Sequence, residues 1–301
     1  MSACASVGSS RVPRAPVASG ACGGGGAVTT PVVSAASAQT VALPPLSLFD
    51  MHVHLDFMLG PARVAHDAAA LGLGMLAVTV TPGGYERAVG GMGLFGAPNV
   101  RVAAGLHPWW LADGRCGPDD VAALEALVGD TRYIGEVGLD FSPGHVGAAA
   151  AGEGARLQVD AFERVCAAAA RLGDRVVSIH AVRSASAVLD VLERTGCCDS
   201  CACVLHWFSG TGEELVRARR LGCLFSVSER MLATRRGRAY AAQIPLDRLL
   251  LETDDPPGEN VPYAAADVAA SLRRAIGLLD ELRRDDVADR VARTSRALLH
   301  L

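Results

Sequence analysis

The chain carries the stretch Phe49-Asp50-Met51-His52-Val53-His54 at the end of its first strongly apolar run. Side chains of a strand alternate in direction, so His52 and His54 face the same way and can chelate one metal ion. An isolated pair of this kind could equally be two core or surface histidines. Its position at the end of an apolar strand, just before Leu55-Asp56, favours a metal site.

Short apolar runs alternate with longer amphipathic stretches, such as 154–172 and 185–194, from residue 46 onward. Continuous runs of Val, Leu and Ile are typical of parallel strands that are buried on both faces. Eight such units in series predict a TIM (β/α)8 barrel, with a doubly wound open sheet as the alternative. The expected strands are 46–53, 75–79, 100–106, 133–137, 176–179, 202–205, 223–227 and 249–251.

Residues 1–45 differ in composition from the rest of the 301-residue chain, because the first acidic residue is Asp50. This Ala-, Gly- and Ser-rich segment predicts a disordered arm, with a transit peptide as the alternative. The remaining residues, 46–301, have the usual length of one TIM-barrel domain. No apolar run reaches membrane-spanning length, which predicts no association with a membrane.

The net charge and the cysteine content indicate which partners and which cellular compartment to expect. The formal net charge of −4 provides no overall attraction to nucleic acid or acidic membranes. Nine cysteines, an odd number, come without a secretory signal, which predicts reduced thiols and a cytoplasmic protein.

Nearly every expected strand ends in side chains that can do chemistry. In a barrel the carboxyl ends of all strands meet at one mouth, whereas an open sheet requires no such relation. Five of the eight histidines occupy these ends, and we interpret His66, His145 and His300 as surface residues. The residues at the strand ends are His52, His54, His107, Glu136, His180, His206, Glu252 and Asp254.

Four imidazoles (His52, His54, His180, His206) and two carboxylates are too many ligands for one tetrahedral ion. They predict two divalent ions, with Glu136 from the middle strand as the bridge. The chain contains no Lys, which excludes a carboxylated lysine bridge. Asp254 is suited to bind one ion and to accept the proton of the attacking water, although it could instead cap a helix before Pro256.

These motifs resemble the TatD family of metal-dependent deoxyribonucleases. Six segments occur in the family's order and cover residues 46 to about 300. They are Phe49–Asp56, Gly105-Leu106-His107-Pro108-Trp109, Ile134-Gly135-Glu136-Val137-Gly138-Leu139-Asp140, Ser178-Ile179-His180, His206-Trp207-Phe208-Ser209-Gly210 and Leu250-Leu251-Glu252-Thr253-Asp254.

The resemblance implies a TIM barrel, a divalent-metal site and hydrolysis of DNA phosphodiesters, often from a 3′ end. It implies a catalytic position for His107, near the substrate phosphate or the leaving oxygen. It also implies a set of six metal ligands: His52, His54, Glu136, His180, His206 and Asp254.

The residues expected near the substrate differ from the usual pattern of the family. Val182 occupies the position where the family usually has an Arg near the substrate, and Arg183 follows it. A neighbour on a turn could reach the phosphate, so Arg183 is the candidate. Trp109 and Trp207 could stack on the bases of a single strand, or could pack against the barrel rim.

The segments 206–210 and 222–227 resemble the TatD-type nuclease component of Qat anti-phage systems. This second resemblance implies a role in antiviral defence, with defence-system proteins as partners.

Two further clusters have alternative interpretations. Cys197, Cys198, Cys201 and Cys203 could hold a structural zinc, but such sites generally use two separated cysteine pairs. We therefore favour a loop with free thiols, in which Cys203 is buried in the sixth strand. A second cluster could be a rim that attracts phosphate or a solvated helix face, and consists of Arg217, Arg219, Arg220, Arg230, Arg235, Arg236 and Arg238.

The sequence thus predicts an exonuclease-type deoxyribonuclease that uses two ions of Mg, Mn or Zn and acts on single-stranded DNA or 3′ ends. One alternative is hydrolysis of another small ester, amide or phosphate on the same barrel. Another is a subunit that is active only within a defence complex. The intact ligand set disfavours a purely structural role.

Overall fold

The structure, a computed structural model, describes residues 43–146 and 152–301. The predicted disordered arm lies outside the described residues except for 43–45, which form neither helix nor strand. The disordered arm and the start of a single barrel domain at residue 46 therefore stay predictions.

Eight strands lie within the described residues, one for each apolar run that the sequence singled out. Their bounds differ from the predicted ones by a few residues at most. The strands are β1 Leu48–Val53, β2 Leu73–Val78, β3 Val100–Ala103, β4 Tyr133–Asp140, β5 Val176–Val182, β6 Ala202–His206, β7 Leu224–Val227 and β8 Leu249–Leu251.

Neighbouring strands pair in parallel, in the orders β1-β2-β3 and β4-β5-β6-β7-β8. A single bridge between Ala104 and Ile134 joins the two groups on one side. On the other side, just beyond β8, the Asp254 N–H donates to the His52 carbonyl. The circle closes, which confirms the TIM barrel over the open sheet.

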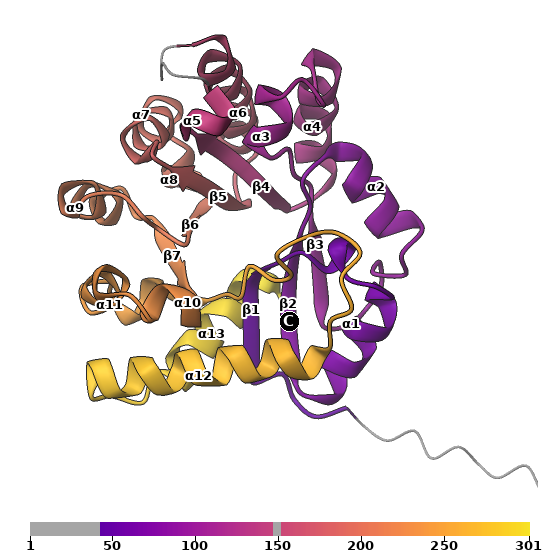
Figure 1. Cartoon of the computed structure of the whole chain (residues 1–301), viewed down its shortest axis with the longest axis vertical. Coiled ribbons are helices and arrows are strands. Elements are labelled where there is room, and N and C mark those ends of the chain that lie inside the picture. The colour runs from indigo at the N-terminus through magenta and orange to yellow at the C-terminus, as the bar shows by residue number, and fades with distance from the viewer. Residues whose placement is uncertain (1–42, 147–151) are drawn as a thin grey trace, which may run out of the picture. The chain divides into compact units, whose positions relative to one another are not determined.

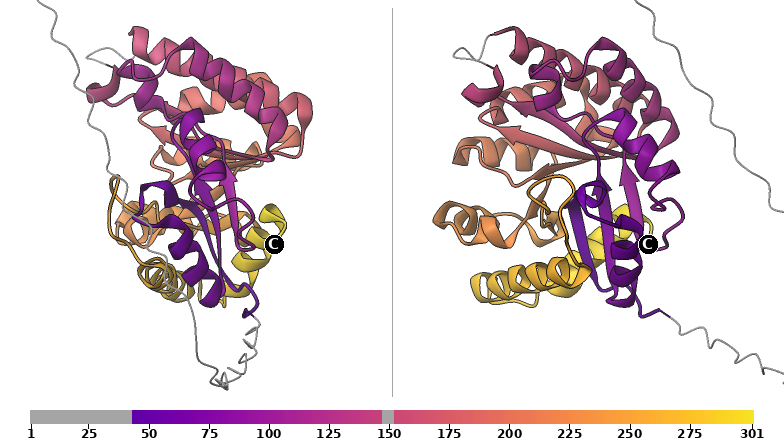
Figure 2. Two further views of the ribbon diagram at one scale, coloured as in Figure 1. Left: turned by 90° about the vertical axis from the view of Figure 1, so that its right-hand side faces the viewer. Right: turned by 45° about the vertical axis from the view of Figure 1, so that its right-hand side comes forward.

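The helices surround the strands, as Figure 1 shows for α1, α2, α4, α6, α7, α9, α11 and α12. Both views in Figure 2 place the carboxyl terminus beside the first strands, where the Arg101 side chain donates to the Leu299 carbonyl. The helices are α1 Pro61–Ala70, α2 Pro82–Gly90, α3 Pro108–Ala112, α4 Pro118–Asp130, α5 Pro143–Val146, α6 Glu153–Leu172, α7 Ala185–Thr195, α8 Cys197–Ser200, α9 Gly212–Arg220, α10 Glu229–Leu232, α11 Arg235–Ala241, α12 Ala265–Arg283 and α13 Ala288–Leu299, with 3-10 turns at Leu55–Phe57 and Leu246–Arg248.

Strand alternation divides the core into two apolar clusters. The larger one packs strands against helices and includes Cys203 and Leu205 of β6. The smaller one includes Val204 of the same strand, together with Val176 and Leu250. His206 lies two residues after Val204, so it shares the face of the smaller cluster. Polar site residues therefore continue the inner face of the barrel toward its mouth.

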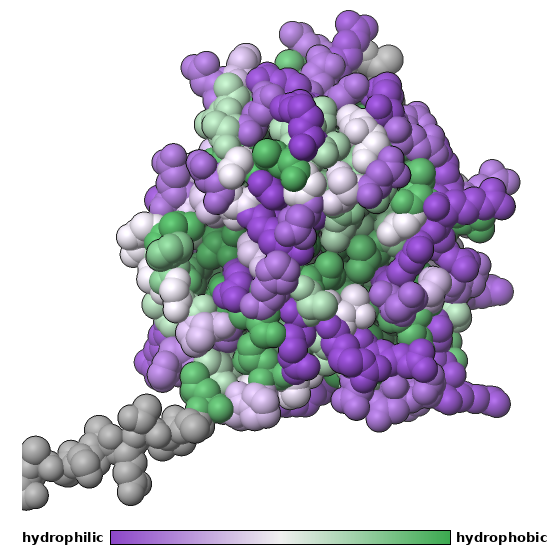
Figure 3. Space-filling model, turned by 180° about the vertical axis from the view of Figure 1, so that it is seen from behind, coloured by the Kyte–Doolittle hydropathy of each residue, from purple (hydrophilic) through white to green (hydrophobic). Residues whose placement is uncertain are grey.

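The outside of the domain is mixed in character. Seen from behind, the surface alternates between hydrophilic areas and smaller apolar patches (Figure 3). Within residues 43–146 and 152–301, no helix is long and apolar enough to cross a membrane.

Candidate metal centre

The candidate metal centre lies where the strands end. His52 belongs to β1, Glu136 to β4, His180 to β5 and His206 to β6, while Asp254 follows β8. All of these residues except Asp254 are at most 7% exposed. The convergence predicted from the sequence is therefore present in three dimensions.

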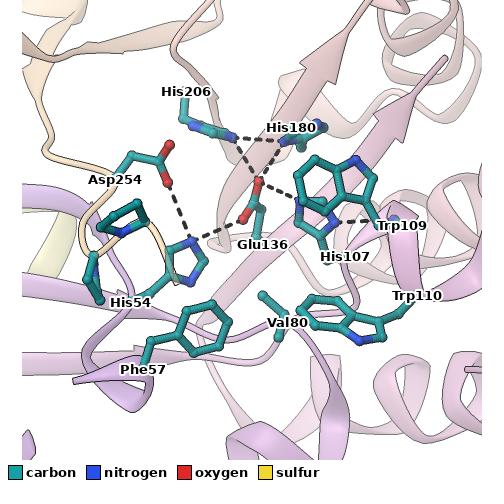
Figure 4. A pocket seen from close by; sticks show the side chains of 12 residues that line it. His54, Phe57, Val80, His107, Trp109, Trp110, Glu136, His180, His206 and Asp254 are labelled. Carbon is teal, nitrogen blue, oxygen red and sulfur yellow. Dashed lines mark hydrogen bonds and ion pairs between the residues drawn. The ribbon is translucent and has the colours of Figure 1, made fainter. Parts of the chain in front are cut away.

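Glu136 stands at the centre of this cluster, and its two carboxylate oxygens face different imidazoles (Figure 4). Oε1 lies 2.7 Å from Nδ1 of His180 and 2.9 Å from Nε2 of His206. Oε2 lies 3.4 Å from Nε2 of both His52 and His54. The carboxylate therefore stands between two groups of ligand atoms, which is the arrangement a bridging carboxylate needs.

Asp254 completes the β1 side of the cluster. Its Oδ1 lies 3.6 Å from Nε2 of His52 and 3.5 Å from Nε2 of His54. Its side chain is 27% exposed, whereas that of Glu136 is 3% exposed. The alternative of a helix cap is not realised, because the next helix, α12, begins at Ala265.

Three overlapping groups among the described residues bring their ligand atoms within 4.8 Å of one another. These atoms are imidazole nitrogens and carboxylate oxygens, which bind several divalent metals. The groups are His52 with His54 and Glu136, His52 with His206 and Asp254, and His107 with Glu136 and His180.

The hydrogen bonds of His52 favour a cation at this place. Ser178 lies 2.8 Å from its Nδ1, so the ring presents Nε2 to the carboxylates. That buried nitrogen has no hydrogen-bond partner within the described residues. Buried polar atoms are normally paired, so a bound metal would satisfy this one.

The pKa values of the site histidines are shifted in opposite directions. Burial alone would lower the pKa of His54 and of His180, but hydrogen bonds to neighbouring carboxylates raise them to about 10 and about 9, so a metal that binds these imidazoles would displace a proton from each. Burial lowers the pKa of His52 to about 4, which keeps its imidazole neutral and able to bind a metal. Burial alone would raise the pKa of Glu136, but His107, His206 and His52 hold it well below the usual value. An ionised carboxylate thus lies at the centre of the imidazoles.

Asp140 holds His180 from the side opposite Glu136. Its Oδ2 lies 3.1 Å from Nε2 of His180 and accepts a hydrogen bond of 2.7 Å from the Trp109 indole. A carboxylate on one ring nitrogen orients the other nitrogen toward a metal. Asp140 had no predicted role, although this residue is the last one of the motif that contains Glu136.

Two glycines let the strands approach each other at the site. A Cβ on Gly105 would lie 1.8 Å from the Thr79 carbonyl oxygen and 2.5 Å from the Glu136 nitrogen. Gly138 has a φ of +140°, and a Cβ there would lie 2.1 Å from the His180 carbonyl oxygen. Larger residues at either position would push the ligand-bearing strands apart.

The model of the family described as TatD related DNase matches residues 49–300. The chain belongs to the TatD family. This membership confirms the resemblance that the six motifs indicated, and the family is metal-dependent.

Curated relatives match over part of their length. The 3′-5′ ssDNA/RNA exonuclease TatD of Edwardsiella piscicida is 35% identical over 160 residues, which are 52% of this chain and 57% of that protein. Human deoxyribonuclease TATDN3 is 31% identical over 123 residues, which are 41% of this chain and 42% of that protein. The chain therefore spans about half the length of the curated relatives that it matches.

Solved structures support the fold. The TatD homologue YJJV from Escherichia coli K12 superposes with a TM-score of 0.68 at 22% identity, covering 85% of this chain and 99% of that one. A TatD family hydrolase from Entamoeba histolytica gives a TM-score of 0.67 at 14% identity, covering 84% and 98%.

The mouth of this TatD family member holds a pocket of about 190 Å³. His107 and Trp109, two of the predicted substrate contacts, line it together with five of the six predicted ligands. His52 is not among the lining residues. The pocket has further walls that the sequence analysis did not name, formed by Phe57, Val80, Trp110, Pro256 and Pro257.

The other two predicted substrate contacts lie elsewhere. Arg183 is exposed and is not among the lining residues of the pocket. Trp207 also lies outside the lining, and its backbone N–H donates to Glu252 over 3.0 Å. The guanidinium of Arg230 lies 5.1 Å from the Trp207 ring centroid, which favours the packing alternative for this tryptophan.

His145 does not lie alone on the surface, contrary to the sequence-based interpretation. Its ring stacks on Trp109 with a centroid separation of 4.3 Å and an interplanar angle of 12°. Because Trp109 lines the pocket at the mouth of the barrel, His145 supports the rim of that pocket. No sequence pattern indicated this contact, because it joins residues of two different helices, α3 and α5.

The cysteines form a thiol cluster at the amino-terminal ends of β6 and β7. Residues 197–200 form the short helix α8 and not the expected loop, and Cys203 is buried in β6 as predicted. Sulfur atoms lie 3.6 Å apart in the pair Cys197–Cys203 and 3.8 Å apart in Cys198–Cys223. We define the thiol cluster as these four residues and Cys201.

Arg217 is one of the seven arginines that the sequence analysis grouped between residues 217 and 238, and its contacts bear on the two interpretations of that cluster. Its guanidinium lies 2.7 Å from an Asp190 carboxylate oxygen and 2.6 Å from a Glu193 carboxylate oxygen. These contacts favour a solvated helix face at this position.

Proposed function

We propose that this protein is a divalent-metal-dependent, exonuclease-type deoxyribonuclease that hydrolyses DNA phosphodiester bonds with two metal ions. The single observation that carries the proposal is the position of Glu136, whose two carboxylate oxygens face separate groups of imidazole nitrogens. The family membership and the names of the relatives support the choice of nucleic acid as the substrate.

We assign the ligands according to the two sides of Glu136. His52, His54 and Asp254 would hold one ion, because their ligand atoms lie on the Oε2 side. His180 and His206 would hold the second ion on the Oε1 side. Glu136 would be the ligand common to both.

When bound, such ions lower the pKa of water toward neutrality and offset the charge of the phosphate oxygens. Asp254 is the ligand whose side chain is partly exposed, so it is placed to accept a proton from the attacking water. His107 lines the pocket, with its Nε2 3.3 Å from Glu136 Oε1. It would contact the scissile phosphate or the leaving oxygen.

The setting of the reaction is also a proposal. Seven cysteines among the described residues are free thiols, which supports action in the reducing cytoplasm on DNA that is single-stranded or has accessible 3′ ends. Mg, Mn and Zn are the candidate ions, because mixed imidazole and carboxylate ligands bind all three. Partners from an anti-phage defence system stay a prediction that rests on sequence resemblance.

The deciding experiment combines a nuclease assay with metal analysis of the same sample. Purified protein supplied with Mg²⁺, Mn²⁺ or Zn²⁺ should shorten single-stranded DNA labelled at its 5′ end, one nucleotide at a time. Duplex DNA and RNA of the same sequence serve as parallel substrates. Glu136→Ala and His206→Ala should abolish the reaction.

His66→Ala is the matched control, because this histidine is exposed on α1 and outside the site. It should behave like the wild type. The proposed site is wrong if Glu136→Ala, shown to be folded by circular dichroism, cleaves DNA as fast as the wild type does.

A further inference from the structure

A second cavity lies directly beside the catalytic pocket. It has a volume of about 290 Å³. Phe57, Val80 and Trp110 line both spaces, so the second cavity adjoins the first. It is therefore a neighbouring space for a substrate strand that places a phosphodiester at the candidate metal ligands.

The shared walls are aromatic and lie against histidines of the site. The Phe57 ring stacks on His54, with centroids 4.9 Å apart and an interplanar angle of 15°. Trp110 meets His107 edge to face, with centroids 5.7 Å apart, and the Arg115 guanidinium lies 4.5 Å from the Trp110 ring centroid. In Figure 4 the two rings lie on either side of Val80, below His54 and Glu136.

The far end of the second cavity is polar. Arg87, on the exposed face of α2, is the cation among its lining residues. Asn260, Glu259 and Asp56 also line this cavity and present one amide and two carboxylate groups. Flat apolar walls with a polar end match a nucleoside, whose base has two apolar faces and whose edges and sugar carry hydrogen-bonding groups.

We propose that this cavity binds the nucleoside next to the scissile phosphodiester, with its base against Phe57 and Trp110 and the polar groups of the nucleoside near Arg87. The proposal rests on the proposed nuclease function and adds to it the residues that would contact the nucleoside. A base in this cavity is unstacked and unpaired. Single strands and frayed ends are therefore substrates, and the interior of a duplex is not.

The test compares two substrates of different size. One is a single-stranded hexanucleotide, and the other is methyl p-nitrophenyl phosphate, a phosphodiester without a nucleoside. Trp110→Leu removes the flat ring but keeps an apolar side chain, and Trp110→Tyr keeps a ring. Arg87→Gln removes the cation.

Trp110→Leu should lower kcat/KM for the hexanucleotide about 10- to 100-fold, mainly through KM, because base–aromatic stacking is lost. Its loss on the small diester should be at least about 10-fold smaller, and Trp110→Tyr should recover most of the difference. Binding of the hexanucleotide in EDTA, measured by fluorescence anisotropy, should weaken in parallel. Arg87→Gln should weaken it less, because the variant keeps an aromatic wall and loses only one polar contact.

Phe95→Leu and Arg63→Gln are matched controls, because both side chains are highly exposed and line neither cavity. Equal losses on the two substrates, or variants that behave like these controls, would overturn the nucleoside site while leaving the nuclease function in place. A wild type that cleaves neither substrate would overturn the proposed function itself.

Discussion

The mouth of the barrel and the thiol cluster both gather side chains that can bind metals, but they differ in geometry. At the mouth, three groups of residues bring their ligand atoms within 4.8 Å of one another. In the thiol cluster, as far as residues 43–146 and 152–301 show, two pairs of sulfur atoms come within 3.8 Å of each other, but no trio meets the 4.8 Å distance. Convergence on one point, and not the number of ligand-type residues, distinguishes a candidate metal centre from packed thiols.

The difference has a topological reason. The residues at the mouth lie at the carboxyl ends of the strands. These ends surround the barrel axis on one face, so the side chains meet there. The cysteines lie on the outer side of β6 and around α8, within the apolar layer between strands and helices. A thiol in that layer behaves as a small apolar side chain.

The largest expected effect comes from removing ligands on either side of Glu136. In the proposed two-ion site, His54→Ala and His180→Ala should each reduce bound metal from two equivalents to about one and lower kcat/KM by more than about 100-fold, beyond the range of outer-shell changes. Metal content by mass spectrometry and DNA cleavage are the measurements. Two retained equivalents in either variant would contradict the assignment of that residue.

The next effect concerns Asp140, which is not proposed to touch the metal. Asp140→Asn should lower metal affinity or activity about 10- to 100-fold, because its carboxylate no longer holds Nε2 of His180. Titration with Mn²⁺ measures the affinity. Asp113→Asn, an exposed carboxylate that contacts Arg115, is the control and should leave the affinity unchanged.

A smaller effect is expected in the thiol cluster. Cys203→Ala should lower the free energy of unfolding by about 1 kcal/mol, because it leaves a small gap beside Cys197. The melting temperature should fall by about 2–4 °C. Metal content and kcat/KM should match the wild type, and loss of a metal equivalent would show that the thiol cluster is a metal site after all.

The smallest effect is expected at Cys198, the half-buried member of the pair with Cys223. Cys198→Ser should change the free energy of unfolding by no more than about 0.5 kcal/mol, since its surroundings are partly open to solvent. Urea unfolding measures this. A loss larger than that of Cys203→Ala would reverse the expected order within the cluster.

Much of the fold could be predicted because strand periodicity is a local property. The predicted strand ends were less accurate than the predicted strand positions. β5 was expected to stop at Ile179 but continues to Val182, because Gly138, Leu139 and Asp140 of β4 offer pairing partners that the polarity of His180 concealed. β3 was expected to reach Leu106 but ends at Ala103, and only a single bridge at Ala104 follows.

The candidate ligands could be identified from the sequence because their residue types and their positions at the ends of apolar runs are both visible there. The aromatic lining could not. Phe57 and Trp110 lie 53 positions apart in the numbering and line the same pocket only because the segments that follow β1 and β3 both lie at the mouth of the barrel. His145 was misjudged for the same reason, since its contact with Trp109 depends on packing between distant segments.

The sequence by itself determined the barrel, the family and the set of residues at the strand ends, because alternation and order along the chain are written in it. Only the tertiary structure decided which atoms face each other. The hydrogen bond between Ser178 and His52, and the division of the two Glu136 oxygens between separate imidazoles, depend on strand stagger and side-chain packing. Strand stagger and side-chain packing are set by contacts between residues far apart in the chain, which a local sequence pattern does not reveal.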